Sequence, residues 1–191
     1  MRLFVAVFPP SEVQRAAHRV IETLRRPDDG VSWVKLENLH YTMRFLGEVG
    51  DDGARRIAEA AIEAASRSSA FEAALGGLGA FPSARRARVI WIGMSAGAEA
   101  LVTLARDLDR ALDKRGFAPE GRPFSAHLTL GRVRAAGPDW TATLAGAPVE
   151  SPPRFTVDRL CVVRSQLNPR GSIYTIQADP RLGVGRPPAA P

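Results

Sequence analysis

Two kinds of hydrophobic pattern alternate along the chain. Short runs rich in β-branched and aromatic residues predict β-strands, and longer segments with an apolar residue at every third or fourth position predict amphipathic helices. Strands are expected at residues 2–8, 31–36, 39–47, 71–81, 88–94, 124–133, 154–167 and 171–178. Helices are expected from Ser11 to Leu24, from Asp51 to Ala65 and from Gly97 to Lys114.

The order of these elements predicts the fold class. Strands and helices interleave without strict strand–helix–strand alternation, which favours an α+β fold with antiparallel sheet. The order strand, helix, strand, strand fits one unit used twice. We therefore expect two antiparallel-sheet lobes with helices outside, an approximate two-fold axis and an active site in the central cleft. One bilobal domain should cover residues 1–178, and the Gly- and Pro-rich tail at 179–191 should be disordered.

The helix faces give a more detailed prediction. In the second helix the apolar residues at helical spacing are expected to point inward. These residues are Ile57, Ala61, Ile62 and Ala65.

Composition narrows the class of protein. The chain has 191 residues, of which 45% are hydrophobic, enough to bury a core. No apolar run approaches the roughly 18 to 20 residues of a bilayer span, and no cleavage pattern follows the first strand. We expect a cytoplasmic protein, monomeric and without membrane contact. Cys161, the one cysteine, lies in an apolar stretch and is expected to be buried.

Charge indicates the kind of partner. The formal net charge is +6 and the sequence pI is about 10.6. Excess basic residues attract phosphate-bearing ligands and speed their arrival. Most of the basic residues are arginines, which suit forked contacts to phosphate.

A short phrase occurs twice, as HYTMRFLG at residues 40–47 and as HLTLGR at 127–132. Side chains alternate between the two faces of a strand, so His40, Thr42 and Arg44 are expected on one face. The other face, with Tyr41, Met43 and Phe45, is expected to be the core side.

The second copy follows the same scheme. Leu128 and Leu130 should point inward, and His127 and Thr129 outward together with the bare backbone of Gly131. Each strand thus presents one imidazole beside one hydroxyl.

These groups suit one type of reaction. Two imidazoles with ordinary pKa values near 6.5 can supply one base and one acid at neutral pH, and two hydroxyls can bind the oxygens of a phosphoryl group. The pair therefore predicts a phosphodiester hydrolase. A single such phrase would indicate only a half-exposed histidine in a strand, and His18 on the first helix is expected to be an ordinary surface residue.

Other chemistries fit poorly. No Cys or acidic cluster with zinc-ligand spacing accompanies the histidines, so no metal is expected. The Gly-rich segment at 75–79 lacks a phosphate-loop pattern, and no cofactor is expected.

The chain resembles a known family. The two HxT phrases, RLFVAVFPP at 2–10, RVIWIG at 88–93 and SQLNPRGSIY at 165–174 are similar to the two-histidine (2H) phosphoesterases. Among them, they resemble most the LigT- and ThpR-like RNA 2',3'-cyclic phosphodiesterases, also called 2'-5' RNA ligases.

The resemblance implies a mechanism and a role for each site residue. It implies metal-independent hydrolysis of a terminal 2',3'-cyclic phosphate to a 2'-phosphate, with weak reversible 2'-5' ligation. His40 would protonate the departing 3' oxygen and His127 would activate water. Thr42 and Thr129 would bind the phosphate, and Arg132 would add a positive charge. Arg132 is out of register with His127 in an ideal strand, so its reach requires a bend, which Gly131 would allow. Arg44 could contact RNA or be solvated.

Two alternatives stay open from the sequence. The chain could act on small cyclic nucleotides or 2'-5' oligonucleotides, or it could bind RNA without chemistry. The sequence determines base recognition poorly. Each aromatic residue near the motifs is expected in the core rather than as a stacking platform; the alternative is that one aromatic at the mouth of the cleft stacks on the base, because single-stranded RNA ends are usually held by stacking. These aromatic residues are Phe4, Phe8, Trp33 and Tyr174.

Overall fold

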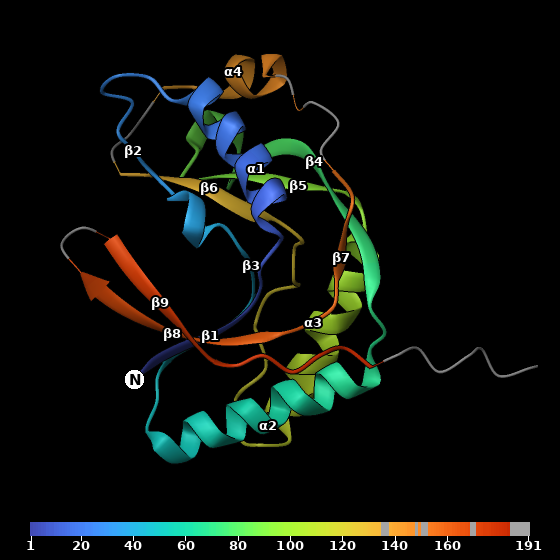
Figure 1. The fold of residues 1–191 in the computed structure, drawn as a ribbon. Coiled ribbons are helices and arrows are strands. Elements are labelled where there is room, and N and C mark those ends of the chain that lie inside the picture. Colours follow the sequence, from blue (N-terminus) through green and yellow to red (C-terminus); the bar gives the residue numbers. More distant parts are fainter. Residues whose placement is uncertain (135–137, 148, 150–152, 169–170, 184–191) are drawn as a thin grey trace, which may run out of the picture.

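The structure is a computed structural model that describes residues 1–134, 138–147, 149, 153–168 and 171–183. Figure 1 shows the arrangement of its helices and strands. The helices are α1 Ser11–Leu24, α2 Asp51–Arg67, α3 Ala98–Asp113 and α4 Thr141–Gly146. The strands are β1 Arg2–Val7, β2 Val31–Trp33, β3 Tyr41–Glu48, β4 Phe71–Phe81, β5 Val89–Ala96, β6 Leu128–Val133, β7 Phe155–Val157, β8 Cys161–Asn168 and β9 Gly171–Ala178.

Most predicted elements are confirmed, although the strands expected at 31–36 and 124–133 are shorter, Val31–Trp33 and Leu128–Val133. Two differences are larger. The strand expected at 154–167 is two strands, β7 and β8, because the intervening residues pair with a later segment: Leu160 N donates to Pro180 O and Leu182 N to Asp158 O. The helix α4 was not predicted, since its six residues are too few to show a helical period.

The strands form two antiparallel lobes that meet at one point, which confirms the predicted α+β, two-lobed architecture. One lobe has the order β3-β1-β8-β9 and the other β7-β4-β5-β6, with β2 on the far side of β6. The lobes join where β3 meets β6, through the pair Tyr41 and Leu128. In Figure 1 the strands of the two lobes diverge from this junction. The first residues of both HxT strands therefore lie side by side.

The main apolar core runs through both lobes, and Phe4, Ala6, Cys161 and Val163 form a second, smaller cluster. The helix α1 packs near β6, while α2 packs against α3 and β8. In Figure 1, α2 lies below β1 and β8 with α3 next to it, and α1 lies above β1 and β8. In α2, Ile57, Ala61 and Ala65 are fully buried as expected. The expectation for Ile62 is wrong: it is 54% exposed, because it lies beside the helical stripe that faces the sheet.

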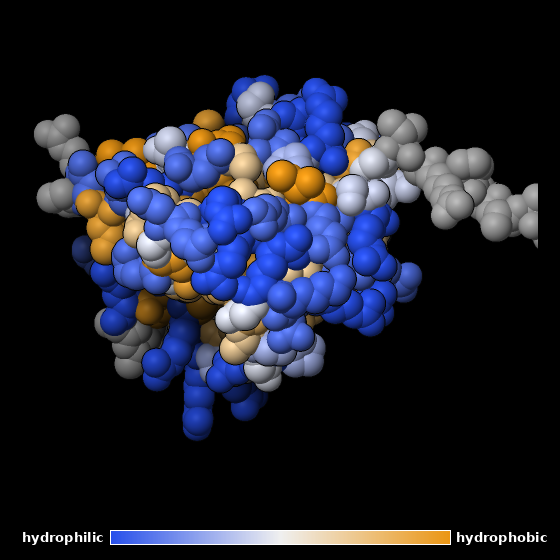
Figure 2. All heavy atoms as spheres, turned by 90° about the horizontal axis from the view of Figure 1, so that it is seen from below, coloured by the Kyte–Doolittle hydropathy of each residue, from blue (hydrophilic) through white to orange (hydrophobic). Residues whose placement is uncertain are grey.

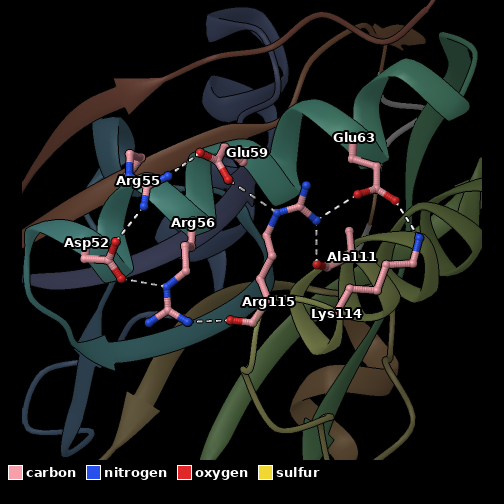
Figure 3. Close-up of polar contacts among 8 residues, drawn as sticks. All are labelled: Asp52, Arg55, Arg56, Glu59, Glu63, Ala111, Lys114 and Arg115. Atoms are coloured by element: carbon pink, nitrogen blue, oxygen red, sulfur yellow. Dashed lines mark hydrogen bonds and ion pairs between the residues drawn. The ribbon is translucent and has the colours of Figure 1, made fainter.

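Ion pairs connect α2 to the end of α3 (Figure 3). Glu63 accepts from Lys114 Nζ at 2.8 Å and from Arg115 Nη1 at 2.7 Å. Arg56 Nη1 donates to the carbonyl oxygen of Arg115. The two basic side chains hold the pKa of Glu63 at about 2, well below its usual value. Figure 2, which views the molecule from below, shows that hydrophilic residues cover most of this face.

The segment after β9 continues to pack on the domain. Leu182 is buried, and Gly183 N donates to Ala65 O at the end of α2. The remainder of the expected tail, 184–191, lies outside the described residues. No helix in the part of the chain that the structure describes is long and apolar enough to cross a membrane.

Candidate active site

Each HxT strand has a β-bulge at the same place. On β3, Thr42 pairs with Ala6 and Arg44 with Val5, which leaves Met43 as the extra residue. On β6, Thr129 pairs with Trp91 and Gly131 with Ile90, which leaves Leu130 as the extra residue. Both bulged residues are the third after the histidine, and both are buried. The two motifs therefore share a backbone shape as well as a sequence.

The bulge shifts the alternation of side chains by one position. Beyond Leu130, Arg132 moves to the face of His127 and Thr129, which supplies the bend that its predicted role requires. Gly131 moves to the packed side, which corrects the expectation that its backbone lies open. A β-carbon on Gly131 would lie 2.6 Å from Val31 Cγ1 and 2.8 Å from Trp33 Cε3.

The same shift on β3 corrects two expectations. Phe45 was expected in the core, but it is 49% exposed and lines the cleft on the side of His40 and Thr42. Arg44 was expected on the face of His40, but its guanidinium turns toward α3. Arg44 Nη1 lies 2.9 Å from Asp109 Oδ1 and 3.1 Å from Glu120 Oε2, and Nη2 donates to Ala118 O.

His40 is held by the backbone that precedes β3. Its Nδ1 lies 2.7 Å from the carbonyl oxygen of Asn38, and its Nε2 lies 3.0 Å from Thr42 Oγ1. A carbonyl oxygen can only accept, so Nδ1 carries the hydrogen and donates it. The Nε2 atom of the neutral ring is therefore the basic one, and it accepts from the Thr42 hydroxyl.

His127 is held in the same way. Its Nδ1 lies 2.8 Å from the carbonyl oxygen of Ser125, again two residues before the histidine. The Nε2 atom is thus also the basic nitrogen of the neutral ring. These carbonyl partners have no signal in the sequence, because any residue type supplies the same backbone oxygen.

Aromatic rings enclose both imidazoles. The centroid of the His40 ring lies 5.0 Å from that of Phe4 and 5.4 Å from those of Phe8 and Tyr174. The His127 ring is 5.0 Å from Phe81 and 6.2 Å from Trp91. Phe4 is buried as expected, whereas Phe8 and Tyr174 are only partly buried. The ring of Trp33 packs against that of Trp140.

These surroundings lower the pKa of both histidines. Burial is the larger cause in each case, and the positive charge of Arg132 adds to it, while the bond to the preceding carbonyl opposes it. Because Arg132 acts on both rings, its guanidinium is electrostatically close to His40 and His127 together. Both rings favour the neutral form in the absence of an anion.

All six predicted site residues line one cleft of about 1700 Å³. Arginines outnumber acidic residues in its lining, and the charged residues are Arg2, Arg44, Arg88, Arg106, Arg122, Arg132, Asp109 and Glu120. The two acidic residues pair with Arg44, so the other five arginines give the cleft a positive charge. The site therefore suits an anionic ligand.

Among the described residues, no group of three or more His, Cys, Asp or Glu side chains is placed to hold a metal ion. Cys161 is buried as expected, and burial raises the pKa of its thiol to about 11.

Family comparison agrees with the duplicated architecture. The family described as LigT like Phosphoesterase matches the chain twice, over residues 7–91 and 92–174. An RNA 2',3'-cyclic phosphodiesterase of Methanothermobacter thermautotrophicus is 37% identical over 182 residues, covering 92% of this chain and 95% of its own length. One of Thermotoga maritima is 33% identical over 177 residues, covering 92% of each chain.

Solved structures show the same fold. A crystal structure of a Thermus thermophilus protein aligns with a TM-score of 0.83 at 30% identity, covering 97% of this chain and all of the other. Escherichia coli LigT complexed with 3'-AMP aligns with a TM-score of 0.76 at 26% identity, covering 95% and 97%.

Proposed function

Because the chain belongs to the LigT-like phosphoesterase family, we propose that it is an RNA 2',3'-cyclic phosphodiesterase that opens the cyclic phosphate to a 2'-phosphate. One observation carries the proposal. Two imidazoles, each with Nδ1 bound to the carbonyl two residues earlier, lie in one cationic cleft with Arg132 acting on both. The alignments with two relatives that are named RNA 2',3'-cyclic phosphodiesterase each cover 92% of this chain.

The proposed reaction moves one proton from water to the leaving oxygen. Nε2 of His127 takes a proton from a water molecule as the water oxygen bonds to phosphorus. The bond from phosphorus to the 3' oxygen breaks, and Nε2–H of His40 gives its proton to that oxygen. After the reaction His127 is protonated and His40 is neutral. His127 then releases a proton to solvent and His40 takes one up, which restores the starting state.

The other site residues bind the phosphate. Thr42 and Thr129 donate hydroxyl hydrogen bonds to its free oxygens, and Arg132 stabilises the negative charge that develops there. The anion counteracts the low pKa of His40, because a neighbouring negative charge favours the protonated imidazole that the acid role requires.

Arg44 has an indirect role in this proposal. Its guanidinium is occupied by Asp109, Glu120 and Ala118 O. The residues that it holds belong to α3 and to the connection that leads to Ser125 and His127. Arg44 therefore supports substrate binding by fixing this connection to β3.

The size of the cleft favours an RNA end over a free cyclic nucleotide. Small-ligand pockets span about 300 to 1000 Å³, and this cleft is about 1700 Å³. Weak 2'-5' ligation follows as the same displacement with a 5'-hydroxyl in place of water: the 5' oxygen bonds to phosphorus as the bond from phosphorus to the 3' oxygen breaks. The cytoplasmic location and the monomeric state stay predictions.

The test is turnover of a short RNA that ends in a 2',3'-cyclic phosphate, with and without chelator. We expect equal rates in both conditions and a loss of about 10² to 10⁴ in rate for His40→Ala and for His127→Ala, the usual contribution of a general acid or base. His18→Ala, which removes the remaining histidine on α1, is the control. Near-normal turnover in either motif variant, or complete loss in chelator, would rule out the two-histidine mechanism.

A further inference from the structure

Phe45 is an exposed phenylalanine in an unusual position. It lies on β3, where it pairs with Phe4 of β1, beyond the pair Tyr41 and Leu128 that joins β3 to β6. It is 49% exposed, and it lines the same cleft as His40 and Thr42. A large apolar side chain open to a ligand cleft costs free energy unless a ligand covers it.

The two HxT motifs have equivalent positions, so the position of Phe45 in the first motif has an equivalent in the second. The bulges at Met43 and Leu130 place the fifth residue after each histidine on the face of that histidine. This residue is Arg132 in the second motif and Phe45 in the first. The cleft thus has a cation at this position in one lobe and an aromatic ring in the other.

A second arginine extends the aromatic surface. Arg2 Cζ lies 5.0 Å from the centroid of the Phe45 ring, and Arg2 also lines the cleft. The exposure of Phe45 remains large with this guanidinium in place. Aromatic rings and arginine planes are the surfaces on which unpaired bases of single-stranded RNA stack.

We propose that Phe45, together with Arg2, forms the platform on which the terminal nucleobase of the substrate stacks. The inference rests on the proposed function, since it places the base of the nucleotide whose phosphate Thr42 binds. Phe45 follows Thr42 by three positions, a span of at most about 10 Å along a strand. A single ribose links the 2',3'-cyclic phosphate to its base, so one nucleotide fits between the two side chains. Stacking on a ring favours purines by area and reads no base edge.

The experiment compares a substrate that has a base with one that lacks it. The two are 2',3'-cyclic AMP and the 2',3'-cyclic phosphate of methyl riboside. For Phe45→Ala we expect kcat/KM on cyclic AMP to fall about 10- to 100-fold, mainly through KM, because one stacking contact is lost. On the riboside the variant should match wild type. Phe45→Trp should restore the activity on cyclic AMP.

Ile62→Ala, which truncates a side chain that is 54% exposed on α2, is the matched control and should change neither rate. Equal losses on both substrates, or no loss on cyclic AMP, would overturn the inference. If wild type hydrolyses neither substrate, turnover of the RNA with a terminal 2',3'-cyclic phosphate tests the proposed function separately. Calorimetric binding of adenosine 2'-phosphate and ribose 2-phosphate to wild type and Phe45→Ala then decides the inference, which requires weakening for the adenosine compound alone.

Discussion

The two histidines make the same hydrogen bond to the backbone, but they differ in the side chains that surround their rings. Both donate from Nδ1 to the carbonyl oxygen two residues earlier, but only His40 has three aromatic neighbours and a bond to its threonine. Sequence reasoning found both residues because two of the three histidines lie in matching phrases. It could not find the enclosing rings, since Phe81 and Trp91 reach His127 through strand pairing that the local sequence does not encode.

Arg132 provides a residue-scale prediction about pH. Its charge lowers the pKa of both histidines, in addition to the larger effect of burial. In Arg132→Gln both pKa values should rise toward their usual range. In the proposed mechanism the base must be neutral and the acid charged, so both limbs of the bell-shaped rate profile should move to higher pH.

NMR titration of the two imidazoles, together with kcat/KM against pH, measures this shift. Arg88→Gln is the matched control, since it removes another arginine that lines the cleft. Imidazole titrations that are the same in Arg132→Gln and wild type would contradict the electrostatic role of Arg132.

At the scale of elements, the hydrophobic pattern predicted the strands well and the directions of their side chains less well. The alternation rule was correct up to the threonine of each motif, so Tyr41 and Leu128 are buried as expected. The rule was wrong beyond the bulges, because each bulge shifts the alternation by one position. Arg44, Phe45 and Gly131 therefore do not lie on the faces that the rule predicts. A bulge depends on the register with a neighbouring strand, and that information is not present in the strand's own sequence.

Gly131 provides an element-scale prediction. In Gly131→Ala the new β-carbon would meet Val31 and Trp33 at 2.6 and 2.8 Å, so β2 or β6 must move. We expect a loss of about 1 to 3 kcal/mol in the free energy of unfolding, as for other overpacked sites. Activity should also fall, because Arg132 is the next residue.

Denaturant unfolding with turnover measures both effects. Gly77→Ala on β4 is the control, since nothing lies within 4 Å of its added β-carbon. Equal stability of Gly131→Ala and wild type would show that β2 packs less closely on Gly131 than the structure indicates.

At the scale of the whole molecule, the two family matches divide the chain within β5, but the fold interleaves strands from both halves. Strand β2 from the first half pairs with β6 of the second, and β8 of the second half pairs with β1 of the first. The sequence order predicted two lobes, but it could not predict this exchange, because strand pairing between distant segments leaves no local signal. Each lobe contains residues of both halves, and one cleft results.

Glu63 links the halves, because it lies on α2 and binds Lys114 and Arg115 at the end of α3. Its pKa is about 2 in the folded protein, whereas a glutamate without partners has a pKa near 4.5. A carboxyl with a lowered pKa stabilises the fold above its unfolded pKa and loses this contribution as pH falls. The loss of the Glu63 contribution is therefore expected between about pH 4.5 and pH 2.

Glu63→Gln should therefore lose less stability than wild type between about pH 7 and pH 3, as measured by thermal unfolding at the two pH values. Asp113→Asn, which removes an exposed carboxylate from the last turn of α3, is the control. The same loss in Glu63→Gln as in wild type would show that other carboxylates control the acid sensitivity.

The central claim is that the two histidines together break the bond between phosphorus and the 3' oxygen, so that the phosphate stays on the 2' oxygen. The most direct measurement is ³¹P NMR of the product formed from an RNA with a terminal 2',3'-cyclic phosphate. We predict a 2'-phosphate as the product with wild type and unchanged cyclic phosphate with His40→Ala. A 3'-phosphate, or a cyclic phosphate that wild type leaves intact, would contradict the account.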